Sequence, residues 1–279
     1  YPAQEAQAAP QWWPVNSMVY SRSRHTSTLL TDGRVLVVGG RNSTGELTQV
    51  EIFDPLANTW SNQVPISIGR FWHTATLLPD GRVLVAVGEL TTGSTLNSAY
   101  LFNPQTGAWT SAGIMLARRS NHTATLLTNG RVLVVGGWGG SSQLNSAEIY
   151  NPSTNTWSLA ASMVGSREAH SANLLPDGKV LVAGGVGGGY LSSAQVYNPV
   201  TNSWTSPLNT LTYARANHTA TLLQDGSVIV VGGYDGAFIS TTERYTPATN
   251  RWTTVTGGAL ITARRYHTAT LLPDGKVLG

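Results

Sequence analysis

Six histidines recur along this chain of 279 residues at intervals of 48 or 49 residues, and each has an arginine three positions before it. Imidazole is a common metal ligand, and the guanidinium fork suits carboxylate, sulfate or phosphate, so either set could bind a ligand. The histidines are His25, His73, His122, His170, His218 and His267. The arginines are Arg22, Arg70, Arg119, Arg167, Arg215 and Arg264.

The histidines are better explained as parts of the fold than as a metal site. Each occupies the same place in a different repeat, so the repeats spread them apart, whereas zinc ligands lie roughly 2.0–2.1 Å from one ion. We therefore predict structural histidines that hydrogen-bond to a neighbouring loop or repeat, with no bound metal and no cofactor. The chain has no cysteine, which excludes disulfides, thiolate chemistry and cysteine-ligated metals.

Each repeat contains the same four extended segments. The first reads HTATLL, which alternates, and the second reads RVLVVGG, a continuous apolar run typical of a strand buried on both faces. Between them stands Asp-Gly or Asn-Gly, the pair favoured in two-residue type I′ hairpins. A variable loop then leads to a strand such as SAEIYNP, a turn such as NPSTNTW, and a strand that begins with the tryptophan.

Four antiparallel strands in about every 48 residues predict an all-β fold, a six-bladed β-propeller whose blades are four-stranded antiparallel sheets. Residues 1–11 are expected to be a flexible segment and residues 12–279 a single propeller domain. The expected blades are residues 25–67, 73–116, 122–163, 170–211, 218–261, and 267–279 together with 12–19. In that last blade the N-terminal strand joins the C-terminal strands and closes the ring. Tryptophans are predicted to pack between blades: Trp60, Trp109, Trp157, Trp204 and Trp252.

The last repeat stops early. It ends at KVLG where other repeats run on to VVGG, so Gly279 stands where the first and third repeats have Val37 and Val134. The third strand of the sixth blade is missing from the sequence. We therefore expect that the natural chain continues beyond Gly279.

The repeat resembles the kelch repeat, in which a double glycine follows an apolar strand, an aromatic residue comes about a dozen residues later, and a tryptophan follows. The double glycines are Gly39-Gly40, Gly136-Gly137, Gly184-Gly185 and Gly232-Gly233, with Val87-Gly88 in the second repeat. The repeat sequence is most similar to those of bacterial kelch-repeat proteins and of the propeller of galactose-oxidase-like proteins. The resemblance implies a β-propeller. The copper site of galactose oxidases needs a cysteine cross-linked to a tyrosine, so that activity is not expected here.

Two interpretations of the six arginines stay open from the sequence. Their guanidinium groups either bond loop carbonyls within each blade or face a ligand. They belong to the loops between blades, on the face that also carries the loops after the double glycines, with Arg24, Arg41, Arg118 and Arg265. This face has ten arginines, which predicts an anion-binding surface. Its acidic residues are Glu46, Glu89, Glu168 and Asp235.

The loops after the double glycines vary most, and function usually depends on such loops. They are residues 41–49, 89–97, 138–145, 186–192 and 234–241. Aromatic residues beside arginine suit a sugar or a peptide, although they could equally cover loop glycines. The candidate ligand-face residues are therefore the six arginines with Arg41, Arg118, Trp72, Trp138, Tyr190, Tyr234, Phe238 and Tyr266.

The sequence favours a binding protein over an enzyme. It has no nucleophile elbow, no HExxH motif, no phosphate loop and no apolar run of the roughly 20 residues that span a bilayer. A net charge of +3 is too mild to predict nucleic-acid binding, and without a long apolar run no membrane insertion is expected. We expect, in this order, a scaffold that binds another protein or assembly subunit, a module for acidic polysaccharide, or the propeller of a larger enzyme whose catalytic part is missing. The expected location is secreted, periplasmic or at the cell surface.

Overall fold

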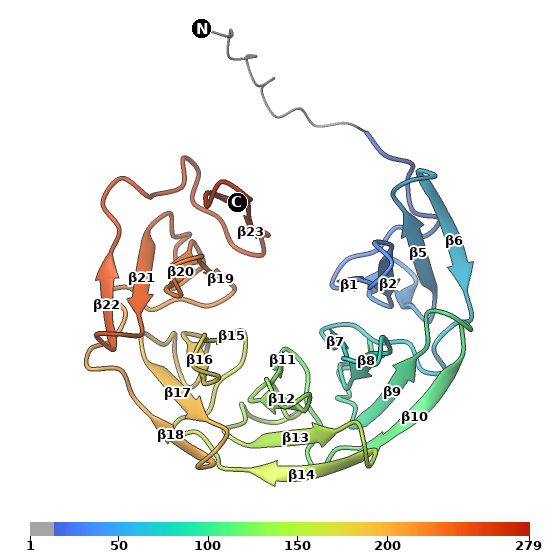
Figure 1. The fold of residues 1–279 in the computed structure, drawn as a ribbon, viewed down its shortest axis with the longest axis horizontal. Helices are drawn as coiled ribbons and strands as arrows, with labels where there is room; N and C mark the ends of the chain where they lie inside the picture. The colour runs from blue at the N-terminus through green and yellow to red at the C-terminus, as the bar shows by residue number, and fades with distance from the viewer. Residues whose placement is uncertain (1–13) are drawn as a thin grey trace, which may run out of the picture.

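The structure is a computed structural model that describes residues 14–279. Antiparallel sheets are arranged around a common centre, with β1, β7, β11, β15 and β19 innermost and β6, β10, β14, β18 and β22 outermost (Figure 1). The first blade contains β1 (Thr26–Leu29), β2 (Val35–Val38), β5 (Val50–Asp54) and β6 (Thr59–Gln63). Its loop carries the short hairpin of β3 (Arg41–Asn42) and β4 (Gly45–Glu46). The second blade contains β7 (Thr74–Leu77), β8 (Val83–Ala86), β9 (Ser98–Phe102) and β10 (Trp109–Ile114).

The remaining blades repeat this order of strands. The third contains β11 (Thr123–Leu126), β12 (Val132–Val135), β13 (Ala147–Asn151) and β14 (Thr156–Ala160). The fourth contains β15 (Ser171–Leu174), β16 (Val180–Ala183), β17 (Ala194–Asn198) and β18 (Ser203–Thr205). The fifth contains β19 (Thr219–Leu222), β20 (Val228–Val231), β21 (Thr242–Thr246) and β22 (Arg251–Thr254). The sixth sheet has two strands, β23 (Thr270–Leu271) and β24 (Val277–Leu278).

The hairpin between the first two strands of each blade differs from the predicted type. In the first blade Leu30 N donates to Arg34 O at 2.8 Å, and Gly33 N donates to Leu30 O at 3.1 Å, so the loop has three residues. Only Gly33 has a positive φ, 86°, which is the geometry of a type I turn followed by a glycine bulge. The type I′ prediction was therefore wrong. Asp32 keeps a negative φ, and its carboxylate accepts a hydrogen bond from the backbone N–H of Arg34 at 3.1 Å, which stabilises this turn.

The hydrophobic core lies between blades rather than within them. Leu36, Val38 and Ile52 of the first blade pack against Val83 and Phe102 of the second, and these side chains are at most 1 % exposed. A flat sheet leaves two apolar faces, and each is covered only when the next blade stacks on it. The repeated apolar strand therefore requires neighbours on both sides.

The double glycine is required where one blade approaches the next. A Cβ on Gly136 would lie 2.5 Å from the carbonyl oxygen of Arg167 and 2.9 Å from Cε1 of His170, both in the following blade. Gly137 N donates to that same Arg167 oxygen at 2.8 Å. Both glycines have positive φ, 60° and 100°. In the second blade Val87 adopts this backbone conformation with a φ of 51°.

The predicted closing strand is described only in part, because Trp12 lies outside the described residues, as does the predicted flexible segment. Residues 14–19 form no strand, so they do not close the ring by strand pairing. They instead contact the first blade: Trp60 Nε1 donates to Asn16 O at 2.7 Å, and Val19 N donates to Glu51 at 2.7 Å. Complete blades make the same contacts with their successors, so residues 16–19 lie where the preceding outer strand would end.

Candidate binding site near the propeller axis

Five of the six repeated arginines are buried, which corrects the prediction that they face a ligand. Arg119 is 0 % exposed and donates from Nη1 to Gly136 O at 2.8 Å and to Ser146 O at 3.1 Å. Its Nη2 pairs with the buried carboxylate of Glu148 at 2.8 Å. Such arginines hold the double-glycine loop to the third strand of their own blade, and they offer no surface to a ligand. They are Arg22, Arg70, Arg119, Arg167 and Arg215.

Burial has the expected electrostatic effect on these arginines. Loss of solvation lowers the pKa of Arg70 and of Arg167 to about 10, so both stay charged at neutral pH. Burial also lowers the pKa of Arg119 and of Arg215, and the neighbouring glutamates oppose that shift. The sixth arginine, Arg264, is exposed, and its Nε donates to Thr262 O at 3.2 Å.

The histidines link neighbouring blades, as expected from the sequence. His73 Nε2 is hydrogen-bonded to the Thr26 hydroxyl of the preceding blade at 2.9 Å, and His122 to Thr74 at the same distance. Within residues 14–279 no group of three or more His, Asp or Glu side chains is arranged to hold a metal ion. The same part of the chain has no helix long and apolar enough to cross a membrane.

The repeated tryptophans also lie at the seams between blades. Trp157 Nε1 donates to Ala112 O of the preceding blade at 2.8 Å, and its ring packs against Tyr150 with centroids 5.0 Å apart. Trp109 and Trp204 donate in the same way, to Val64 O and Ala161 O. Trp252 is 3 % exposed and packs on Tyr245.

A ring of backbone hydrogen bonds connects the blades near the axis. The residue before each histidine has a positive φ between 51° and 58°, and from the second blade onward its N–H donates to the carbonyl of its counterpart one blade earlier, at 3.0–3.3 Å. This backbone ring consists of Arg24, Trp72, Asn121, Ala169, Asn217 and Tyr266. A left-handed conformation is unfavourable for most of these residue types, so the neighbouring blades must impose it. Because the backbone makes the bonds, the six side chains are free to differ.

Two tryptophans and two glutamates from three different blades line a cavity of about 240 Å³ beside this ring. Trp72 and Glu89 belong to the second blade, Trp138 to the third and Glu168 to the fourth. Glu89 accepts a hydrogen bond from Ser120 at 2.8 Å. Glu168 accepts from the amides of Asn121 at 3.0 Å and Gln143 at 3.1 Å. Among the described residues neither carboxylate makes an ion pair, so this axial pocket combines two indoles with two carboxylates, and the Arg24 guanidinium lies over Trp72 at 4.0 Å.

A second group of predicted residues forms an aromatic platform on the fourth to sixth blades. Tyr190 and Phe238 each pack edge-on against Tyr234, with centroids 5.6 and 5.4 Å away. The Arg265 guanidinium lies over Tyr234 at 4.2 Å and also over Tyr266 at 5.3 Å. The exposed rings make this platform amphipathic.

The other predicted residues lie apart from these two groups. Arg41 stacks over the buried ring of Phe71 at 5.2 Å, and Arg118 donates to Thr95 O at 3.1 Å. Because five of the ten arginines on this face have buried side chains, five remain at its surface together with four carboxylates. The strongly positive face predicted from the sequence is therefore not formed. The exposed or half-buried arginines are Arg24, Arg41, Arg118, Arg264 and Arg265.

The sequence pattern did not predict that Glu89 and Glu168 lie at one site. A usable signal was present, because Glu89 and Trp138 each follow the second glycine of their repeat. This position pairs with the loop before the histidine of its own repeat, as in the bridges Phe71–Glu89, Ser120–Trp138 and Glu168–Val186. Aligned repeats would therefore have placed these positions on one circle near the axis.

Comparison with known proteins agrees with this architecture. Residues 72–278 match the KLHDC2/KLHL20/DRC7 Kelch-repeats domain, and residues 22–65 match the Kelch motif. The chain belongs to the kelch-repeat β-propeller family. The solved structure of YjhT, a bacterial kelch protein, superposes on this chain with a TM-score of 0.72 at 14 % sequence identity. The superposed region covers 89 % of this chain and 88 % of the YjhT chain. At that identity the likeness shows the fold alone. No curated protein sequence matches the chain significantly.

Proposed function

We propose that this kelch propeller is a non-catalytic binding module that holds a protein partner at its axial pocket. The observation that carries the proposal is the pairing of Trp72 and Trp138 with Glu89 and Glu168 around one cavity. Indole faces attract cations, by about 0.5–1 kcal/mol at exposed sites and about 2 kcal/mol or more when water is excluded. Two carboxylates without a basic partner add to that attraction. The pocket therefore suits a lysine or arginine side chain presented by a peptide segment.

Kelch propellers typically mediate binding, which makes this role consistent with the family. The carboxylates of the pocket accept hydrogen bonds from neutral groups, which fix their direction without neutralising them. Arg24 already occupies one face of Trp72, with its guanidinium 4.0 Å from the ring centroid, so the proposal relies mainly on Trp138 and the two carboxylates. An exported or surface location is still a prediction, and the pocket chemistry is compatible with it.

A carbohydrate is the second candidate ligand, because the platform of Tyr190, Tyr234 and Phe238 offers stacked rings beside Arg265. Aromatic faces pack against sugar rings, and the guanidinium can bind a sugar carboxylate. Burial of the repeated arginines removes the main support for a strongly acidic glycan. A protein partner is therefore the better-supported ligand.

The experiment is selection of peptides from a random library on the immobilised protein, followed by calorimetry with the selected peptides. We expect lysine- or arginine-containing peptides, whose binding weakens at least about tenfold in Trp138→Ala and in Glu168→Gln. Tyr234→Ala is the matched control, because it removes an aromatic ring from the platform and leaves the axial pocket intact. The same variants are tested on a panel of neutral and acidic polysaccharides.

The outcomes separate the candidates. Peptide binding that needs Trp138 and Glu168 but not Tyr234 supports the protein-binding role. Glycan binding that needs Tyr234 favours the second candidate. Selection without enrichment of basic residues, or peptide binding indifferent to Trp138 and Glu168, contradicts the proposed pocket.

A further inference from the structure

The hairpin turn of the third blade differs from the equivalent turns by one residue type. The residue before the turn glycine is aspartate in five repeats and asparagine, Asn129, in the third. The asparagine makes the same turn, because its side-chain oxygen accepts the backbone N–H of Arg131 at 3.1 Å, as the Asp80 carboxylate accepts that of Arg82 at 3.0 Å. The φ of the following glycine is similar in both turns, 78° and 83°. The asparagine therefore removes a negative charge and leaves the turn unchanged.

The missing charge leaves one arginine without a partner. In each of the other turns the aspartate pairs with a basic side chain. These pairs are Asp32–Arg34, Asp80–Arg82, Asp177–Lys179, Asp225–Arg244 and Asp274–Lys276. Within residues 14–279 the exposed Arg131 guanidinium has no ion pair and no hydrogen-bond acceptor. Its charge is therefore available to a ligand.

Arg131 borders a groove of about 730 Å³ between the second and third blades, which is called the Arg131 groove below. The turn after β7 lines one side of it, and the turns after β11 and β13 line the other. Strand β12 runs from this groove at Val132 to the double glycine and Trp138 at its other end. The Arg131 groove therefore lies on the face of the propeller opposite to the axial pocket.

The third blade presents hydrogen-bond donors to this groove. Asn151 Oδ1 accepts the backbone N–H of Ser153 at 3.1 Å, and Asn129 Oδ1 is likewise occupied, so each asparagine keeps its amide N–H groups as donors. The Arg131 guanidinium adds five N–H groups, and Ser153 adds a hydroxyl. Across the groove the Asp80 carboxylate is already paired with Arg82. The uncompensated charge of the groove is therefore a single guanidinium.

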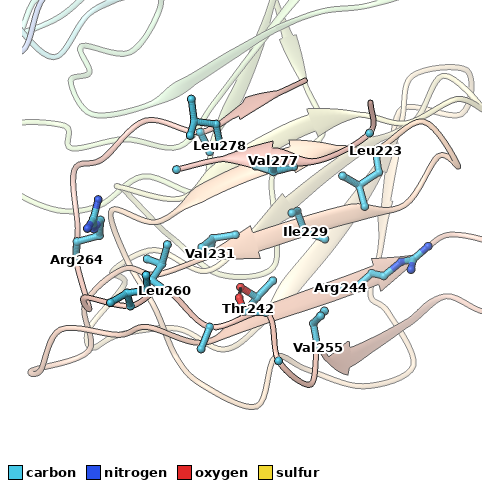
Figure 2. A pocket seen from close by; sticks show the side chains of 17 residues that line it. Leu223, Ile229, Val231, Thr242, Arg244, Val255, Leu260, Arg264, Val277 and Leu278 are labelled. Atoms are coloured by element: carbon cyan, nitrogen blue, oxygen red, sulfur yellow. Dashed lines mark hydrogen bonds between the residues drawn. The ribbon is translucent and has the colours of Figure 1, made fainter. Parts of the chain in front are cut away.

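Two other grooves in the described part of the chain have a different character. The groove between the fourth and fifth blades, of about 430 Å³, contains Asp177 and Asp225, and each of these carboxylates is paired with a basic side chain. The groove beside β20 and β24 is lined mainly by aliphatic side chains (Figure 2). An unpaired cation among neutral donors therefore distinguishes the Arg131 groove from both.

We propose that the Arg131 groove binds the carboxylate of an aspartate or glutamate residue in an extended segment of a partner protein. The planar guanidinium fork matches a carboxylate through two parallel hydrogen bonds. One uncompensated positive charge balances one carboxylate, and the asparagine and serine donors bond backbone carbonyls of the same segment. The cavity is far larger than a lone ion, which favours an anion carried by a polypeptide. This site is independent of the axial pocket, which takes a cation on the opposite face.

The test is an NMR titration of the isotopically labelled protein with the capped peptide SGEGS, followed through the backbone amide resonances of residues 129–131. We expect saturable shifts with a dissociation constant on the order of 1 mM, because the peptide offers a single charged contact. The peptide SGQGS differs only in the charge of its central side chain. It should bind at least about tenfold more weakly, because a bidentate charged hydrogen bond is lost.

Protein variants give an independent readout. Arg131→Gln should weaken SGEGS binding at least about tenfold. Asn129→Asp restores the aspartate of the other five turns, gives Arg131 an internal partner and repels the peptide, so it should weaken binding at least about fivefold. Asp177→Asn is the matched control, because it makes the reverse change at the turn of the fourth blade and should leave the affinity unchanged. These side chains are exposed at turns, so the variants are expected to fold, and circular dichroism checks this.

The outcomes that overturn the proposal are specific. They are resonances that SGEGS leaves unmoved, equal binding of SGEGS and SGQGS, and full affinity in Asn129→Asp. Inorganic phosphate that shifts the same resonances at a lower concentration than SGEGS would assign the groove to a free anion and overturn the assignment to a protein partner. Binding that is lost in Trp138→Ala would place the peptide at the axial pocket and overturn the assignment to the Arg131 groove.

Discussion

Lowering the pH from 7 to 5 is expected to destabilise the propeller through its buried histidines. His73 is 5 % exposed, and burial, with Arg70 and His25 nearby, lowers its pKa to about 3. Burial lowers the pKa of His218 to about 3 as well, and it acts in the same direction on His122 and His170. His73 and His218 therefore stay neutral in the folded protein at pH 5.

The sign of the effect follows from proton binding. An unfolded histidine has a pKa of about 6.5 and takes up a proton as the pH falls below that value, whereas folded His73 does not until about pH 3. The unfolded state thus binds more protons, and stability is lost progressively between about pH 6.5 and pH 3. For one such histidine the loss between pH 7 and pH 5 is about 2 kcal/mol. His73 and His218 together therefore lose about 4 kcal/mol, a large part of the stability of an ordinary domain, about 5–15 kcal/mol.

Urea denaturation at pH 7, 6 and 5 measures this loss. The variant His73→Asn lowers stability at every pH but should reduce the difference between pH 7 and pH 5 by about 2 kcal/mol. His267→Asn is the control, because His267 is only half-buried and should flatten the pH dependence less. A total change below about 1 kcal/mol between pH 7 and 5, or an NMR titration of His73 near its ordinary pKa, would refute the reasoning.

Two further substitutions test how the blades are joined. Gly184→Ala should destabilise the protein by at least about 2 kcal/mol, because its Cβ would lie 2.5 Å from a backbone oxygen at a φ of 65°; Gly188→Ala, at a φ of 80° in open space, should cost only about 1 kcal/mol, and equal costs in thermal unfolding would contradict the packing. Arg119→Met should cost about 3–5 kcal/mol, because Glu148 would be left buried and unpaired. Arg118→Met is its exposed control, with an expected change within about 0.5 kcal/mol in urea denaturation.

The repeat unit could be read almost completely from the sequence. Alternation in HTATLL and the continuous apolar run after it predicted the first two strands, and the structure places β1 and β2 there. The positions of the tryptophans and histidines between blades could also be predicted, because a residue present in every repeat is expected to make a contact that every blade makes with its neighbour. These inferences needed only local periodicity and the count of repeats.

The arginines show where such reasoning stops. Arg118 and Arg119 are neighbours in sequence, yet Arg119 is buried and Arg118 is exposed. The Arg119 guanidinium points into the blade, where it bonds Gly136 O and Glu148, which lie 17 and 29 residues later in the chain. The turn type failed for a related reason, since the Asp32 side chain selects between two loop geometries that share the same Asp-Gly pair.

By itself the sequence determined the blade, its strands and the number of repeats, because these depend on local residue patterns that recur in every repeat. Only the tertiary structure decided which side chains face solvent together. Trp72, Glu89, Trp138 and Glu168 become one pocket because stacking brings three blades to a common axis, and no spacing within a single repeat contains that geometry.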